Sequence, residues 1–136
     1  MKKSIRMFLA VCAAGAAVAV LAQSKPPHSG EQILLETAAE REAWLNLRGW
    51  QVGTPQESRT RIPQQWKTLP GQRWLAVQNA QGLHPEQYAG CEVSRLVYPV
   101  TGTGQSELYA ELLFYDNTLI GAQVYSAETG IIQSVR

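Results

Sequence analysis

The spacing of apolar residues in the first half of the chain predicts helices. A short apolar run at 32–35 is followed by residues 37–40 (TAAE), which match the capping box that begins many helices. We therefore expect a strand at 32–35 and a helix over 38–48, where apolar residues recur at helical spacing. Gly49 stands where a helix-ending residue is expected, and 50–52 is predicted to form a short strand.

The middle of the chain is predicted to hold a second helical region. Residues 54–61 (TPQESRTR) are polar and are predicted to form a surface loop. A helix or turn is expected at 64–69, and Pro70-Gly71 interrupts it before a main helix at 72–81. One further turn is expected at 85–88.

From Cys91 onward the apolar residues alternate, which is typical of strands. A strand is expected at 91–98, and Pro99 either ends its pairing or leaves it at a sheet edge. Two more strands flank Asp116-Asn117, two residue types that tolerate the left-handed conformations of a tight hairpin turn. These two strands are predicted at 107–115 and 118–126, and a last apolar stretch covers 131–135.

The register of this hairpin predicts two apolar faces. With Tyr115 opposite Thr118, the better core candidate is the face that carries Leu108, Ala110, Leu112 and Phe114 against Leu119, Gly121, Gln123 and Tyr125. The other face is unusually apolar, since one-sided antiparallel sheets normally alternate with polar residues. We expect a partner to bind it, unless the N-terminal strand region or the C-terminal tail covers it. The candidate binding residues on this face are Tyr109, Leu113, Tyr115, Ile120 and Val124.

These elements predict one α+β domain at 31–136. Its antiparallel sheet of three to four strands is expected to be covered on one face by two or three helices. A length of 136 residues fits one domain, since domains commonly have about 100–150 residues. Residues 23–30 (QSKPPHSG) contain two prolines and a glycine and are predicted to be a linker.

The N-terminus is typical of an export signal. Basic residues at positions 2, 3 and 6 precede an uncharged apolar stretch at 7–21, and the compact residues that follow predict signal cleavage after Ala22. Residues 1–22 are therefore predicted to be a signal peptide. The rest of the chain is expected to be extracytoplasmic, either secreted or held at the outer face of the cytoplasmic membrane. The alternative is an uncleaved anchor, because the apolar stretch is close to membrane-span length.

Composition and charge narrow the possible functions. A hydrophobic share of 45% is too high for a disordered chain, and a net charge of +1 lacks the basic footprint of a nucleic-acid binder. Loss of residues 1–22 removes three of the twelve basic residues and no acidic one, so nine against eleven leave a charge of −2. Cys12 is read as apolar filler of the signal rather than a lipid acceptor. Cys91 then stands alone, and no intrachain disulfide is expected.

Candidate catalytic chemistry is sparse. A small envelope hydrolase acting on peptidoglycan or peptides would need a cleft with at least two convergent titratable groups, for example His84 with Cys91 or Glu92, because a nucleophile requires a base within hydrogen-bond reach. Nothing in the sequence brings these side chains together, and metal-ligand spacings and phosphate-cradling glycine motifs are absent. No catalytic residue, cofactor or metal is therefore predicted.

The four tryptophans are the remaining candidates for a binding site. Trp44 and Trp50 bracket the end of the first helix and are expected to pack into the core. Trp66 and Trp74 are also interpreted as core residues, with an aromatic platform for a glycan as the alternative.

Several short motifs over residues 40–130 resemble, in order and approximate spacing, a bacterial family known as domain of unknown function 4830. The motifs are REAWLNLRGWQV (41–52), Ile62-Pro63, Gln81-Gly82-Leu83, Tyr88-Ala89-Gly90, and Leu112-Leu113-Phe114-Tyr115 leading to Leu119-Ile120-Gly121. The resemblance implies a small exported or lipoprotein-type protein and supplies neither an activity nor catalytic residues.

The sequence thus predicts a non-enzymatic binding or interaction module of the bacterial cell envelope. Its expected partner is an envelope protein or a second copy of the chain. The alternatives are a small envelope hydrolase and a glycan-binding module. No nucleic-acid partner is expected, and contact with a membrane is expected only through an uncleaved signal segment.

Overall fold

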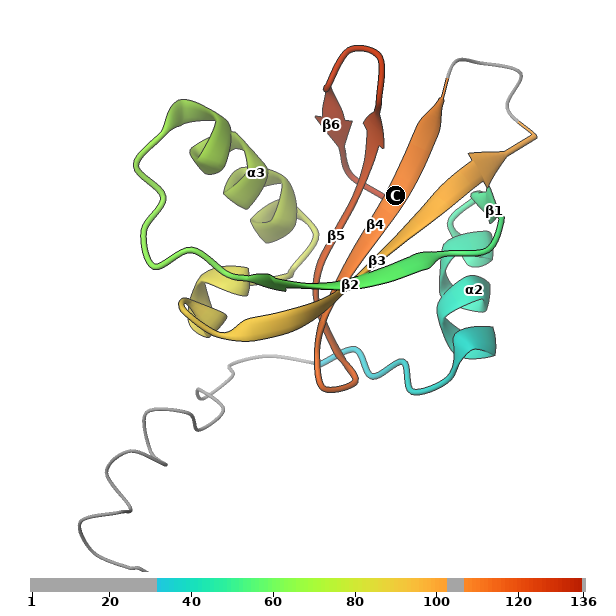
Figure 1. Cartoon of the computed structure of the whole chain (residues 1–136), viewed down its shortest axis with the longest axis horizontal. Helices are drawn as coiled ribbons and strands as arrows, with labels where there is room; N and C mark the ends of the chain where they lie inside the picture. The colour runs from blue at the N-terminus through green and yellow to red at the C-terminus, as the bar shows by residue number, and fades with distance from the viewer. Residues whose placement is uncertain (1–31, 103–106, 136) are drawn as a thin grey trace, which may run out of the picture.

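The computed structural model describes residues 32–102 and 107–135 (Figure 1). The signal peptide and linker predicted at 1–30 lie outside these residues. In chain order the elements are α2 (Ala38–Leu47), β1 (Gln51–Val52), β2 (Gln56–Arg61), α3 (Leu69–Ala80), the 3-10 turn η1 (Pro85–Tyr88), β3 (Glu92–Thr101), β4 (Leu108–Tyr115), β5 (Thr118–Ser126) and β6 (Ile132–Gln133).

The strands form one antiparallel sheet in the order β1-β3-β4-β5-β6, and β2 also pairs with β3. The predicted α+β class is confirmed, but the sheet has six strands rather than three to four. The strand that the sequence missed is β2, in the stretch predicted to be a loop. Its residues are mostly exposed, because it is an edge strand, and edge strands often carry charged side chains that discourage further pairing.

The first helix begins where its capping box predicted. The Thr37 hydroxyl accepts a hydrogen bond from the backbone N–H of Glu40 at 3.1 Å, and the Glu40 carboxylate accepts the N–H of Thr37 at 3.0 Å and that of Glu36 at 2.8 Å. The two backbone donors, that of Glu36 first, lower the pKa of Glu40. Gly49, at φ 93°, adopts the left-handed conformation that follows the helix.

The second helix begins at Leu69, earlier than predicted. Thr68 is its N-cap and accepts the backbone N–H of Gly71 at 3.1 Å. Pro70 fits in the first turn, where backbone N–H groups have no partner within the helix. Pro70-Gly71 therefore belongs to the start of the helix and does not interrupt it, and residues 64–68 form no helix.

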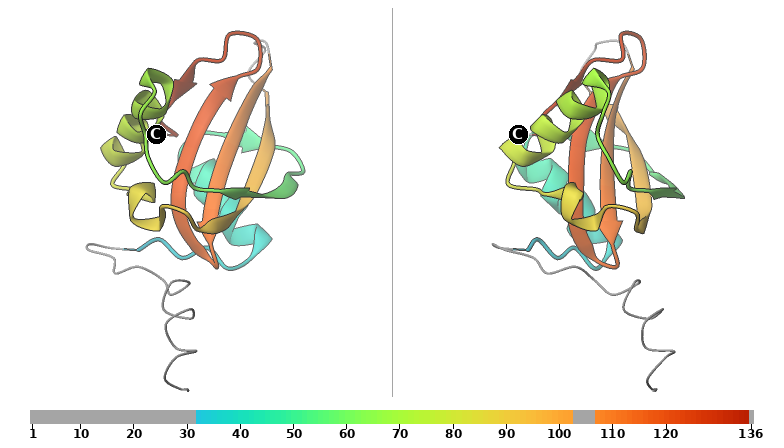
Figure 2. Two further views of the ribbon diagram at one scale, coloured as in Figure 1. Left: turned by 60° about the vertical axis from the view of Figure 1, so that its left-hand side comes forward. Right: turned by 90° about the vertical axis from the view of Figure 1, so that its left-hand side faces the viewer.

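The two helices lie on different sides of the sheet, which corrects the expectation of helices on one face only. Figure 2 shows α2 behind the sheet and α3 in front of it. Leu45 of α2 is fully buried in a first core with residues such as Leu112 and Phe114. A second core, formed by Ile62, Tyr88, Val93, Leu113 and Ile120, packs against Trp74 of α3.

A β-bulge in the β4–β5 hairpin changes which residues face which core. Tyr115 lies opposite Thr118 as predicted, but Leu113 pairs with Gly121 and Phe114 with Leu119, so Ile120 is an extra residue. Beyond the bulge each β5 residue lies on the face opposite to the predicted one. Val124 is buried in the first core, and Gln123 lies on the face of Glu111, its partner across the strands. The prediction that Val124 lies with Tyr109 and Leu113 is wrong.

The outer edge of β5 is covered by three different parts of the chain. At its start Leu119 donates its N–H to the carbonyl of Ile33 at 2.8 Å, and at its end Val124 and Tyr125 pair with β6. The strand predicted at 32–35 is thus a single bridge, between Leu34 and Thr118.

In the middle of this edge, glutamine side chains of α3 and of its C-cap take the place of a strand. The Gln78 side-chain oxygen accepts the backbone N–H of Ala122 at 2.7 Å, and the Gln81 amide donates to the Ala122 carbonyl at 2.7 Å. Gln81 also accepts the backbone N–H of Val135 at 2.9 Å, and Trp50 donates its indole N–H to the Val135 carbonyl. These bonds tie α3 and the C-terminus to the sheet.

We predict that Gln78→Leu lowers the free energy of unfolding by about 2–3 kcal/mol, because a buried backbone N–H loses its acceptor. Gln78 is 0% exposed, so water cannot replace the lost acceptor without opening the core. Urea unfolding followed by far-UV circular dichroism measures the change. The matched control Gln72→Leu, at an exposed position of the same helix, loses only a solvent-exposed hydrogen bond of 3.3 Å to the Trp66 carbonyl and should stay within about 0.5 kcal/mol of the parent protein. Equal losses in both variants would contradict this account of α3.

Candidate functional site

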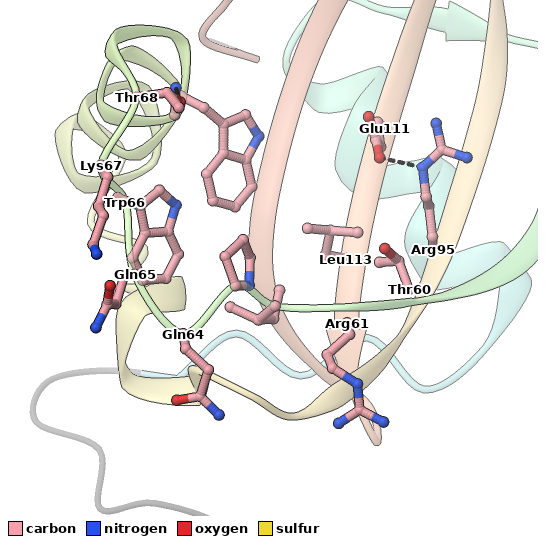
Figure 3. Close-up of a pocket in the computed structure, with 14 residues that line it drawn as sticks. Thr60, Arg61, Gln64, Gln65, Trp66, Lys67, Thr68, Arg95, Glu111 and Leu113 are labelled. Carbon is pink, nitrogen blue, oxygen red and sulfur yellow. Dashed lines mark hydrogen bonds and ion pairs between the residues drawn. The ribbon is translucent and has the colours of Figure 1, made fainter.

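A groove of about 660 Å³ opens between the sheet and the segment that leads into α3 (Figure 3). This volume lies in the range of about 300–1,000 Å³ that is common for ligand sites. The end of β2 and residues 62–68 form one wall, the start of α3 forms another, and side chains of β3 and β4 complete the lining. The residues that matter most here are Arg61, Ile62, Trp66, Lys67, Trp74, Arg95, Glu111 and Leu113.

The groove has an apolar floor and two aromatic side chains. Ile62 and Leu113 are buried in the second core beneath it. Trp66 and Trp74 are partly buried against this core, with ring planes 6° apart and ring centroids 6.5 Å apart. Both side chains line the groove, so the two tryptophans serve the core and the groove at once. The indole N–H of Trp66 donates to no residue among those that the structure describes.

A chain of hydrogen bonds fixes Trp74 to the sheet. Its indole N–H donates to the side-chain oxygen of Gln123, which also accepts from the amide of Gln78 at 2.8 Å. The Gln123 amide donates to Glu111 at 2.9 Å, and the other oxygen of Glu111 accepts from the guanidinium of Arg95. Gln123 reaches this network because the bulge turns it toward this face of the sheet.

The charges that line the groove are mostly positive. Arg61, Lys67 and Arg95 line it together with one carboxylate, that of Glu111. Glu111, whose side chain is 12% exposed, is paired with Arg95. Within residues 32–102 and 107–135, Arg61 and Lys67 have no carboxylate at ion-pair distance, although Arg61 donates to the carbonyl of Gly90 at 2.6 Å. Figure 3 shows these two side chains on the rim of the groove, with their charged ends directed outward.

The residues considered for hydrolysis form no catalytic arrangement in the described part of the chain. His84 Nδ1 lies 3.2 Å from the amide nitrogen of Asn79 and 3.2 Å from the carboxylate of Glu86. Cys91 packs against the second core, and Glu92 lies 3.6 Å from Arg59. No hydrogen bond joins His84 to Cys91 or to Glu92. Among the described residues, no group of three or more His, Cys, Asp or Glu side chains could hold a metal ion.

The five residues proposed for the second hairpin face do not form one exposed surface. Leu113 and Ile120 are buried in the second core, and Val124 is buried in the first. Tyr115 packs against Tyr88 with ring centroids 5.2 Å apart, and Tyr109 stacks on Tyr125 at 5.6 Å. Residues 62–66 and α3 cover much of this face, rather than the N-terminal strand region or the C-terminal tail. Leu113 alone of the five lines the groove.

Sequence reasoning found Trp66 and Trp74 but missed the polar side chains beside them. Arg95 and Glu111 come from neighbouring strands, and Arg95 pairs in register with Leu113 rather than with Glu111. Their diagonal contact could be found only with the correct strand register. The role of Gln123 depends on the bulge, for which the sequence carries no clear signal.

Comparisons with known proteins give no relative for this chain: no family model, no curated protein and no solved structure matches it. The resemblance to the domain of unknown function 4830 therefore stays a prediction. None of the helices in the described residues has the length and apolar character needed to cross a membrane.

We predict that Trp74→Phe lowers the free energy of unfolding by about 1 kcal/mol more than Trp44→Phe does, because both changes make the aromatic side chain smaller but only the first loses a hydrogen bond, the one to Gln123. Guanidinium unfolding followed by circular dichroism gives the value. Trp44→Phe is the matched control, since the indole N–H of Trp44 donates to no described residue and its ring lies against the first core. The assignment fails if both substitutions have the same effect.

Proposed function

We propose that this chain is a non-enzymatic binding module of the bacterial cell envelope and that its ligand binds in the groove beside Trp66. The observation that carries the proposal is the combination of two parallel indole rings with two rim cations that have no acidic partner in the described chain. Such a surface offers flat apolar contact and charge to a ligand, which is typical of recognition sites.

The packing of the groove supports binding in a further way. Trp74 is held by Gln123, and the floor residues are buried in the second core. A site whose side chains are already fixed loses little conformational freedom when a ligand arrives, so more of the contact energy appears as affinity. Trp74 and the apolar floor are therefore already in position to receive a ligand.

Export is the second part of the proposal, and it rests on the sequence of residues 1–22. The basic start, the apolar stretch and the compact residues before position 23 form the pattern of a cleaved signal. An envelope ligand is the expected consequence, because an exported module meets cell-wall material and envelope proteins first.

We predict that Trp66→Leu weakens binding to solubilised cell-wall fragments at least tenfold, which corresponds to about 1.4 kcal/mol. Leucine keeps an apolar side chain over the second core but removes the flat indole from the groove. Isothermal titration calorimetry measures the affinity, and circular dichroism checks the fold. Trp44→Leu makes the same change on the other side of the sheet and should leave the affinity unchanged. No heat with the parent protein, or equal loss in both variants, would remove the groove from consideration.

We also predict that the chain recovered outside the cytoplasm begins at Gln23, because a signal peptidase cuts after Ala22. Intact-mass spectrometry of the fractionated protein detects the loss of residues 1–22. A chain found only in the cytosol with Met1 still attached would contradict export, and a full-length chain in the membrane fraction would favour the anchor alternative.

A further inference from the structure

We infer that the groove binds an acidic glycan, that is, a chain of sugar rings that carries carboxylate groups. This inference rests on the proposed function, since it names the class of ligand for the same site. Three properties of the groove carry it: the orientation of the indole rings, the polar groups around them and the sign of the charge.

The aromatic side chains suit sugar rings. The face of an indole carries partial negative charge, and the C–H bonds on the flat side of a pyranose carry partial positive charge, so the two surfaces attract each other. Because the planes of Trp66 and Trp74 differ by only 6°, neighbouring sugars of an extended chain can meet both rings without a change of direction. The volume of about 660 Å³ accepts more than one sugar ring.

The polar groups around the rings suit hydroxyl groups. Gln64 and Gln65 are exposed beside Trp66 and line the groove, and neither amide has a hydrogen-bond partner in the described part of the chain. Thr68 accepts the N–H of Gly71, which leaves its own hydroxyl proton available to a ligand. Amide and hydroxyl groups can both donate to and accept from sugar hydroxyls.

The charge of the groove favours an anion. Arg61 and Lys67 bring two positive charges to the rim, whereas the chain without residues 1–22 has a net charge of −2. The cations are therefore concentrated at the groove against the overall sign of the protein.

An extended acidic peptide is the competing class, and the geometry favours it less. A peptide would gain most by pairing with the free edge of β2, as peptides do when they add a strand to a sheet. This edge strand carries charged residues at alternate positions, which discourage the addition of another strand: Glu57, Arg59 and Arg61. A peptide strand also requires pockets for its alternate side chains, and two parallel indole rings offer flat surfaces instead of such pockets.

The experiment is a calorimetric titration of the full-length chain with a galacturonic acid hexamer and with the same hexamer as its methyl ester. The two probes have the same sugar rings, and the ester replaces each carboxylate by an uncharged methyl ester. We expect the acid form to bind at least fivefold more tightly at low ionic strength. Lys67→Gln should weaken binding of the acid form about two- to fivefold and leave binding of the ester unchanged. Arg73→Gln removes the same charge from an exposed position of α3 that does not line the groove, and it should have no effect.

The outcomes separate this inference from the proposed function. Equal binding of acid and ester that depends on Trp66 overturns the acidic preference but keeps the groove as a binding site. A hexaglutamate peptide that binds more tightly than the acid hexamer, with the same dependence on Lys67, replaces the glycan by an acidic peptide. If wall fragments bind through Trp66 while neither hexamer binds, the assignment of a carboxylated sugar chain is wrong and the proposed function stands. If neither the wall fragments nor the hexamers bind in a way that depends on Trp66, both the acidic-glycan inference and the proposed function are overturned.

Discussion

The structure depends on how the backbone in the middle of the outer edge of β5, between the Leu34 bridge and β6, finds its hydrogen-bond partners. Backbone groups in the interior of a protein need hydrogen-bond partners, and Ala122 obtains both of its own from the side chains of Gln78 and Gln81. Because the two glutamines are three positions apart, they lie on one side of the helix and its C-cap. This interaction sets where α3 lies along the sheet, and the position of α3 in turn sets the wall of the groove.

The same polar contacts extend from the sheet edge into the candidate site. Gln78 and Trp74, one helical turn apart, both donate to Gln123, which continues to Glu111 and Arg95. A fully connected network of this kind specifies one arrangement, since any alternative leaves a buried polar atom without a partner. The groove is therefore built by the interactions that hold α3 on the sheet, and fold and candidate function share the same residues.

Local features of the sequence predicted the local parts of this fold. Thr37 with Glu40 located the start of α2, and Asp116-Asn117 located the hairpin turn, because both signals act over a few residues. Three features needed long-range information. The polar residues of β2 form a strand only because β3 offers an edge, and the extra residue Ile120 exchanges the faces of β5. The bonds that hold α3 on the sheet join Gln78 and Gln81 to Ala122, which is 44 and 41 positions away. The sequence identified the tryptophans of the groove as candidate binding residues, but it did not identify the polar residues beside them.

The contact between Val135 and Trp50 has a consequence for how the first core closes. Val135 is fully buried, and its backbone carbonyl receives the indole N–H of Trp50 from 85 residues earlier in the chain. Contacts between residues so distant in sequence form slowly, because the long loop between them must close before the contact contributes any stability. The end of the first core that Trp50 and Val135 form therefore comes together only after the chain between them has been brought into place.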